Sequence, residues 1–171
     1  DAGFQLQFSD ANNGWASVLN LTTGLHKYYK TTNGGSTWNL ISTDDSWKIC
    51  HFIDLNNGWA IDPWFLGQST SSKIYHTTNG GASWQEQKED PLQGQYHAIQ
   101  FTDINNGWVV GENGKILKTT NGGASWTTYE NTVITADYTG NCINFINATT
   151  GWIGISNGTM ETSKVLHTTN G

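Results

Sequence analysis

Three aspartates stand at the same position of a repeated segment and are the first candidates for chemistry. Asp10, Asp54 and Asp103 each lie between a Phe and a Gly-Trp pair. Two carboxylates about 5–10 Å apart across a glycosidic bond would make a glycoside hydrolase. A carboxylate in a turn also accepts hydrogen bonds from nearby backbone N–H groups. Because these aspartates recur whenever the turn recurs, we interpret them as turn formers and predict no catalytic residue.

Metal and disulfide chemistry lack the required spacing. The segment after Asp54 resembles a calcium loop, but its Gly comes four residues after the Asp, whereas an EF-hand loop needs about five. None of the five histidines stands at a metal-ligand spacing from another. We therefore expect no metal and no cofactor. Cys50 and Cys142 are expected on first strands facing opposite ways, which disfavours a disulfide.

The charge balance excludes two further classes of function. The chain has eight Lys, no Arg and 14 acidic residues, with a formal net charge of −6. Phosphate backbones are bound by clustered Lys and Arg, so a nucleic-acid partner is not expected. A sialidase holds its substrate carboxylate with Arg, which this chain lacks. No apolar run approaches the about 18–20 residues of a membrane helix, so membrane insertion is not expected.

An interleaved repeat runs through the whole chain. The first unit, Phe-x-Asp-x-Asn-Asn-Gly-Trp, begins at Phe8, Phe52 and Phe101, and a decayed copy begins at Phe145. A second unit reads Thr-Thr-Asn-Gly-Gly-Ala/Ser-Ser/Thr-Trp, and a last copy stops at Gly171. Its key residues are Thr31, Asn33, Gly35, Trp38, Thr77, Asn79, Gly81, Trp84, Thr119, Asn121, Gly123 and Trp126.

Each period is predicted to form four short antiparallel strands. Polar and apolar residues alternate before Phe8, which indicates a first strand. Asn-Asn-Gly is predicted to be a hairpin turn because Asn and Gly accept positive φ at little cost, and Asn113-Gly114 a second one. Four strands in about 45 residues match one propeller blade. We therefore predict an all-β propeller region, 1–171, with blades at approximately 3–46, 47–94, 95–138 and a truncated 139–171.

The second unit resembles the Asp-box, or bacterial neuraminidase repeat, Ser/Thr-x-Asp-x-Gly-x-Thr/Ser-Trp. With the Asn-Asn-Gly-Trp unit, the pattern is most similar to the photosystem II stability/assembly-factor-type repeats of secreted bacterial proteins. The resemblance implies a turn between the third and fourth strands of each blade. Asn replaces the Asp of the box at Asn33, Asn79, Asn121 and Asn170, and it keeps the acceptor oxygen that the turn needs.

The resemblance also bears on the size of the propeller. Asp-box propellers more often have six to eight blades than four, and an open arc leaves two exposed edges. We therefore expect further blades of the same parent chain, or a second copy, beside the four present.

Departures from the repeat provide the candidate ligand-binding residues. Trp64 and Phe65 lie in the longest insertion, next to Asp62, and Trp47 is the other Trp outside the repeat. Aromatic loops can stack on a sugar or anchor a protein, or they can pack on their own blade. A polar residue precedes each repeat Phe and is expected to line the axial channel, as a wet lining or as a ligand site: Gln7, His51, Gln100 and Asn144.

These patterns favour a non-catalytic, extracellular binding or scaffolding propeller that recognises a protein or glycan through blade-edge loops and the axial face. The chain is accordingly expected to be secreted or at the cell surface. The main alternative is a fragment of an oligoxyloglucan-type glycoside hydrolase whose catalytic acids lie partly outside this chain. An assembly factor for a membrane complex is a third alternative, which the absence of Arg disfavours.

Overall fold

A computed structural model describes residues 4–20, 22, 25–44, 48–62, 71–91, 94–129, 136–157 and 162–171. These residues form fifteen β-strands and no helix, and among them no helix is long and apolar enough to cross a membrane. The strands make four antiparallel sheets, three of four strands and one of three. The predicted all-β propeller fold is therefore confirmed.

Each sheet is built from consecutive strands in chain order. The first contains β1 (Phe4–Phe8), β2 (Gly14–Leu19), β3 (His26–Thr31) and β4 (Asn39–Asp44). The second contains β5 (Ile49–Phe52), β6 (Gly58–Ile61), β7 (Ser71–Thr77) and β8 (Gln85–Pro91). The third contains β9 (Tyr96–Phe101), β10 (Gly107–Gly111), β11 (Ile116–Thr119) and β12 (Thr127–Thr128). The fourth contains β13 (Tyr138–Phe145), β14 (Gly151–Asn157) and β15 (Ser163–Thr168).

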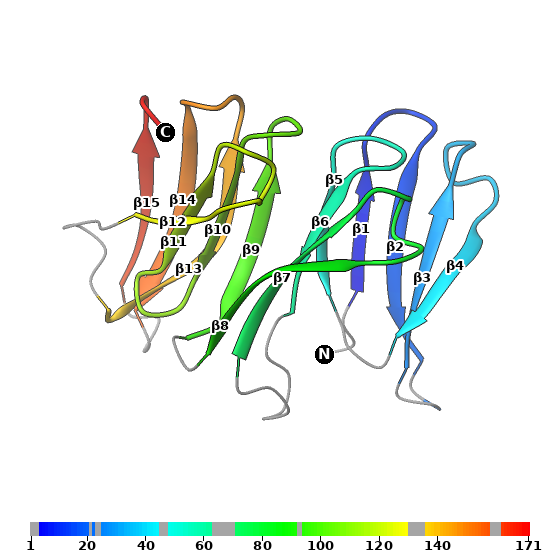
Figure 1. Ribbon diagram of the computed structural model, residues 1–171, viewed down its shortest axis with the longest axis horizontal. Helices are drawn as coiled ribbons and strands as arrows, with labels where there is room; N and C mark the ends of the chain where they lie inside the picture. Colours follow the sequence, from blue (N-terminus) through cyan, green and yellow to red (C-terminus); the bar gives the residue numbers. More distant parts are fainter. Residues whose placement is uncertain are drawn as a thin grey trace.

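The sheets stand face to face as successive blades of an arc (Figure 1). The first strands of neighbouring blades contact one another in the order β1, β5, β9, β13. Buried side chains therefore meet between blades, and the largest cluster joins Trp59, Ile61 and Ile74 of the second blade to Tyr96 and Phe101 of the third. The core of this fold lies at the blade junctions, because each short sheet has no other layer to cover its apolar face.

The glycine of each Asn-Asn-Gly unit is required because a side chain there would collide with the ring of the repeat Phe. The predicted reason, a positive φ at this glycine, is wrong. Gly107 begins β10 and pairs with Phe101 across the ladder, and it is not among the positive-φ residues. A Cβ on Gly107 would lie 2.5 Å from the Phe101 ring. The other predicted hairpin is confirmed, since Asn113 and Gly114 have φ of 55° and 67°, as an Asn-Gly turn of this kind requires.

Replacing Gly107 with Ala is expected to destabilise the protein by about 1–3 kcal/mol, because the buried Phe101 ring cannot move from beneath Trp59. Gly14→Ala is the matched control. Its Cβ would lie 2.8 Å from Phe8, but the Phe8 ring is exposed and can turn aside. Urea unfolding measures both variants. Equal losses, or no loss at Gly107, would contradict crowding as the reason for the glycine.

Candidate functional site

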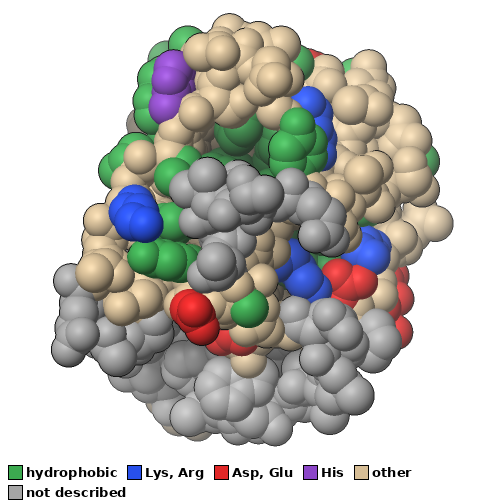
Figure 2. Space-filling model, turned by 90° about the vertical axis from the view of Figure 1, so that its left-hand side faces the viewer, with side chains coloured by type: hydrophobic (Ala, Val, Ile, Leu, Met, Phe, Trp, Pro, Cys, Tyr) green, Lys and Arg blue, Asp and Glu red, His purple; other side chains and the backbone are tan. Residues whose placement is uncertain are grey.

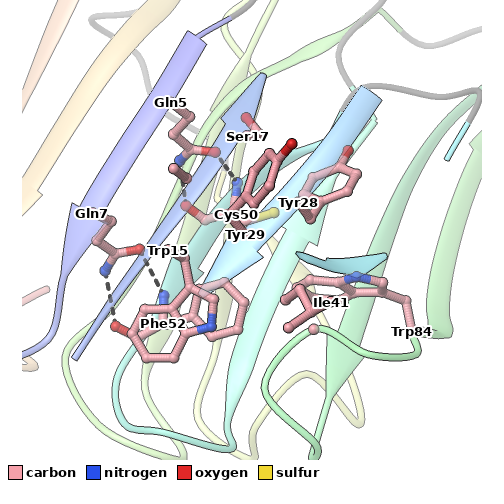
Figure 3. Close-up of a pocket in the computed structure, with 12 residues that line it drawn as sticks. Gln5, Gln7, Trp15, Ser17, Tyr28, Tyr29, Ile41, Cys50, Phe52 and Trp84 are labelled. Atoms are coloured by element: carbon pink, nitrogen blue, oxygen red, sulfur yellow. Dashed lines mark hydrogen bonds between the residues drawn. The ribbon is translucent and has the colours of Figure 1, made fainter. Parts of the chain in front are cut away.

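The polar residue before each repeat Phe binds the backbone of the next blade. Gln7 Nε2 donates to the carbonyl oxygen of Phe52 at 2.8 Å, and the Phe52 N–H donates to Gln7 Oε1 at 2.9 Å (Figure 3). Gln100 holds Phe145 through the same two bonds, at 3.0 and 2.6 Å. We call this pair of bonds the amide clamp. A side-chain amide suits the role because it offers one donor and one acceptor to a peptide edge.

His51 occupies the clamp position of the second blade and makes half of the clamp. The Phe101 N–H donates to His51 Nδ1 at 3.3 Å, so this nitrogen must be unprotonated. Burial lowers the pKa of His51 to about 4, which keeps the ring neutral near pH 7. Asn144, which occupies the same position in the fourth blade, is exposed on β13. Gln7, His51 and Gln100 thus form hydrogen bonds between blades. A role of these positions in ligand binding remains a prediction.

A Trp of one blade stacks on the repeat Phe of the next at every junction. The rings are nearly parallel, with interplanar angles of 3°, 8° and 11°. Aromatic pairs add about 0.5–1.5 kcal/mol each beyond the burial of apolar area. The centroid distances are 4.1 Å for Trp15 on Phe52, 3.6 Å for Trp59 on Phe101 and 3.8 Å for Trp108 on Phe145.

The Asp-box loop of the receiving blade takes part in the same junction. Trp15 Nε1 donates to the carbonyl oxygen of Gly80 at 3.0 Å, and Trp59 Nε1 donates to that of Gly122, also at 3.0 Å. The Trp that ends each box meets the repeat Phe of its own blade edge-on, at 5.9, 5.8 and 5.8 Å. Each repeat Phe of a complete blade therefore lies between two indoles at an internal junction.

The residue just before each box covers the second face of the Trp on the second strand of its blade. The sequence analysis did not assign this role, although the alternation of Lys and His at this one position could have indicated it. Lys30 lies over Trp15, with Nζ 5.3 Å from the ring centroid, and its ammonium donates to the carbonyl oxygen of Leu55 in the next blade. His76 stacks on Trp59 at 4.6 Å. Lys118 and His167 cover Trp108 and Trp152 in the same way.

The box Asn organises its own turn. In the second blade Asn79 Oδ1 accepts from the Ser83 N–H at 3.0 Å and from Thr77 Oγ1 at 2.9 Å, while Asn79 Nδ2 donates to Ser83 Oγ at 2.8 Å. Asn33 and Asn121 make equivalent bonds. The amide thus supplies the acceptor expected of an Asp and one additional donor.

The repeat aspartates are engaged in their turns. Asp54 accepts from the N–H groups of Asn56 and Asn57 at 2.8 and 2.7 Å, and Asp10 and Asp103 make the same bonds. Partial burial acts to raise the pKa of Asp54, but the hydrogen bonds from Asn57 and Asn56 outweigh it, so the pKa lies below its ordinary value. These carboxylates are ionised turn formers.

Charged clusters lie at the opposite end of the blades from these turns. Asp90 accepts from Tyr96 Oη at 2.6 Å and pairs with Lys88 at 2.6 Å and Lys115 at 3.1 Å. Burial opposes ionisation of Asp90, but these three partners lower its pKa to about 2. Asp62 accepts from Tyr75 Oη at 2.7 Å and faces Lys48 Nζ at 3.8 Å. Among the described residues no group of three or more His, Cys, Asp or Glu could hold a metal.

The remaining candidates are placed as follows. Trp47, Trp64 and Phe65 lie outside the described residues. Cys50 is buried in β5, Cys142 is exposed on β13, and no disulfide joins them. A hollow of about 100 Å³ lies between the third and fourth blades, and residues of both blades, such as Trp108 and Leu166, line it. Figure 2 looks onto this side of the molecule, where hydrophobic side chains lie around a depression.

Four-stranded blades, stacked through Trp–Phe pairs and closed by Asp-box-type turns, define a β-propeller of the bacterial neuraminidase repeat class. The model of the family described as photosynthesis system II assembly factor YCF48 matches residues 86–171, half of the chain. The chain belongs to this family.

Solved structures agree on the fold. YCF48 bound to a D1 peptide matches with a TM-score of 0.57 and 17% identity, covering 96% of this chain and 67% of its own. The GH74 enzyme of Niastella koreensis matches with a TM-score of 0.56 and 15% identity, covering 91% of this chain and 28% of its own. One relative is an assembly factor and the other an enzyme, and identities this low establish the fold alone. No curated protein sequence matches the chain.

The family corrects one expectation from the sequence. A secreted or cell-surface location was predicted from a low-charge composition rich in Asn, Thr and Gly, and this prediction is wrong. The family is that of a photosystem II assembly factor, and assembling photosystem II is not the work of a secreted surface protein. Composition misled because the Asn, Thr and Gly residues serve the repeated turns wherever the protein is found.

The His51 clamp predicts a pH-dependent stability. Because the folded-state pKa is about 4 and the ordinary value is 6.5, the unfolded chain takes up the proton first, and stability falls by up to about 3 kcal/mol as the pH drops from 6.5 to 4. His51→Gln, which restores the two-bond clamp, should remove most of this slope in urea unfolding across that range. His76, whose pKa is also lowered by burial, contributes to the slope in the same direction.

The matched control is His167→Gln, which changes an exposed histidine and should leave the slope intact. An unchanged slope in the His51→Gln protein would contradict the assignment of the pH dependence to the clamp.

Proposed function

We propose that this chain is a non-catalytic propeller that holds a segment of a protein partner, as an assembly factor does. The observation that carries the proposal is that the carboxylates suited to catalysis are already engaged by the fold. Asp10, Asp54 and Asp103 are bound within their turns, and Asp62 and Asp90 are paired with Lys and Tyr. Membership of the YCF48 family supports the same conclusion.

We place the contact surface at the end of the blades where the sequence departs from the repeat. At the other end, the Asn-Asn-Gly turns and the box loops bond to each other, as Gly80 N–H does to the Asn56 carbonyl oxygen at 2.8 Å. The non-repeated segments 45–47 and 63–70 join strands at the opposite end, and they carry Trp47, Trp64 and Phe65. A partner that binds in one register must read features that differ between blades, and buried aromatic anchors are the commonest source of binding energy.

Contacts within the blades hold the described residue that precedes the longest of these segments, Asp62, in place. Asp62, its first neighbour in the chain, accepts from Tyr75 Oη of β7, and the Lys48 ammonium lies 5.1 Å from the Tyr75 ring centroid. The Lys48 N–H in turn donates to Tyr28 Oη of the first blade at 3.0 Å. These contacts tie the start of the segment to two blades, and a fixed base lowers the entropy cost of binding a partner.

A protein partner is preferred over a glycan because YCF48, a member of the same family, was solved with a D1 peptide. The alternative of a glycoside hydrolase fragment has the GH74 fold in its favour, but it needs acids other than the engaged ones named above. Glycan binding and hydrolysis are therefore outcomes of the test below.

Binding of a fluorescently labelled D1 peptide, measured by polarisation, tests the proposal. We expect a Kd in about the micromolar range and a loss of at least about tenfold in a Trp64→Ala/Phe65→Ala variant. Leu40→Ala, which removes an exposed apolar residue on an outer strand, is the matched control and should bind as the parent does.

Absence of peptide binding, together with hydrolysis of a polysaccharide panel, would overturn the proposed function in favour of the enzyme. Peptide binding that is unchanged in the double variant would overturn the assigned surface.

A further inference from the structure

Two histidines flank the indole that joins the second blade to the third. His51 of β5 and His76 of β7 pair with Trp59 of β6 from its two sides, so the three side chains lie on the face of the sheet that meets Phe101. The same two positions hold Gln and Lys at the other junctions: Gln7 and Lys30 beside Trp15, and Gln100 and Lys118 beside Trp108. Of the three described junctions, this one is therefore flanked by the side chains that titrate closest to neutral pH.

Protonation of His51 removes the hydrogen bond that this residue makes across the junction. The Phe101 N–H donates to His51 Nδ1 at 3.3 Å, and a protonated imidazole carries a hydrogen on both nitrogens and accepts no bond. The amides of Gln7 and Gln100 bind the next blade at the same place through bonds that do not depend on pH. Acid therefore turns an attraction into a repulsion between two donors, and it does so at this junction.

Protonation of His76 places a positive charge beside buried apolar surface. The ring stacks on Trp59 with the centroids 4.6 Å apart, and its Nε2 is buried without a hydrogen-bond partner among the described residues. Lys30 and Lys118, at the same position, instead direct their ammonium groups to carbonyl oxygens of the next blade. Burial lowers the pKa of His76, so the closed junction keeps this ring neutral near pH 7.

Few charged groups face His51 from the elements packed against it. The strands β1 and β6 carry no titratable side chain. The strand β9 carries two, and both have an acidic partner: Tyr96 with Asp90, and His97 with Glu112. The aspartates of the two adjoining turns, Asp54 and Asp103, are bound within those turns. Burial is accordingly the cause of the lowered pKa of His51.

The charged groups near His76 are engaged with one another. His76 pairs with Gln85 of β8, and the box loop of the third blade, residues 119–126, has no titratable side chain. The charged side chains of β7 and β8 form their own ion pairs: Lys73 with Glu86 and Glu89, and Asp90 with Lys88 and Lys115. Within the part of the chain that the structure describes, neither His51 nor His76 has a carboxylate that would hold its proton.

We infer that acid loosens the arc selectively at the junction between the second and third blades, through His51 and His76. The open junction takes up protons that the closed junction excludes, so a fall in pH favours local opening. The pKa of His51 is about 4 in the closed junction and returns toward its ordinary value of 6.5 in the open one. The junction is therefore secure above pH 6.5 and weakens progressively down to pH 4. Gln7 and Gln100 keep the other two junctions closed over the same range.

Amide hydrogen exchange measured by NMR at pH 7 and pH 4 tests the inference, with each rate divided by that of an unstructured peptide at the same pH. The protection of the Phe101 N–H should fall about a hundredfold, as pKa values of 6.5 and about 4 require. The N–H groups of Phe52 and Phe145, which face Gln7 and Gln100, should lose much less. No loss at Phe101 would overturn the inference. An equal loss at all three amides would also overturn it, because the protons would then be taken up only when the whole chain unfolds.

Substitutions taken from the other blades test the assignment to these two residues. His51→Gln together with His76→Lys gives the second blade the pair found beside Trp15 and Trp108, and this protein should keep most of its Phe101 protection at pH 4. His51→Gln alone should already remove most of the fall. His167→Gln changes a histidine stacked on Trp152, outside this junction, and is the matched control that should leave the fall intact. Variants of His51 that lose Phe101 protection as the parent does would overturn the assignment.

Discussion

The stack of an indole on the repeat Phe of the next blade is the interaction on which this structure depends. A four-stranded sheet of short strands has little stability alone, and here each blade covers its neighbour's apolar face. The stacked ring explains the Gly-Trp pair of the repeat, because Phe101 lies over Gly107 and beneath Trp59. The amide clamp fixes how far each blade sits along its neighbour. The stacked Trp and Phe, the glycine beneath the Phe and the clamp side chain therefore set the geometry of the arc together.

This division of work separates architecture from function. The aromatic and amide side chains of the repeat are engaged at the junctions between blades. The surface that can distinguish one partner from another is therefore the part of each blade outside the repeat. The same fold then supports a GH74 enzyme and an assembly factor that differ in activity. An assembly factor benefits from a rigid frame, because loops on a fixed base lose less entropy when they bind.

The sequence was sufficient for the fold because the period of the repeat and its turn residues specify blades directly. It did not reveal the role of Gln7, His51 and Gln100, since alternation shows which face a side chain takes but not what lies opposite. The reason for Gly107 was missed because turn chemistry was considered before the volume of the facing Phe101. The ligand-binding role of Trp64 stays a prediction. The predicted secreted location was wrong because Asn, Thr and Gly are abundant for the sake of the repeated turns, and their abundance carries no information about location.

Amide hydrogen exchange, followed residue by residue in NMR spectra of dilute protein, tests the central claim most directly. If the clamp and stack secure each junction, the N–H groups of Phe52, Phe101 and Phe145 should exchange at least about a hundredfold more slowly than that of Phe8. Equal exchange at Phe8 and Phe52 in the dilute protein would contradict the claim that the inter-blade junction stabilises the structure.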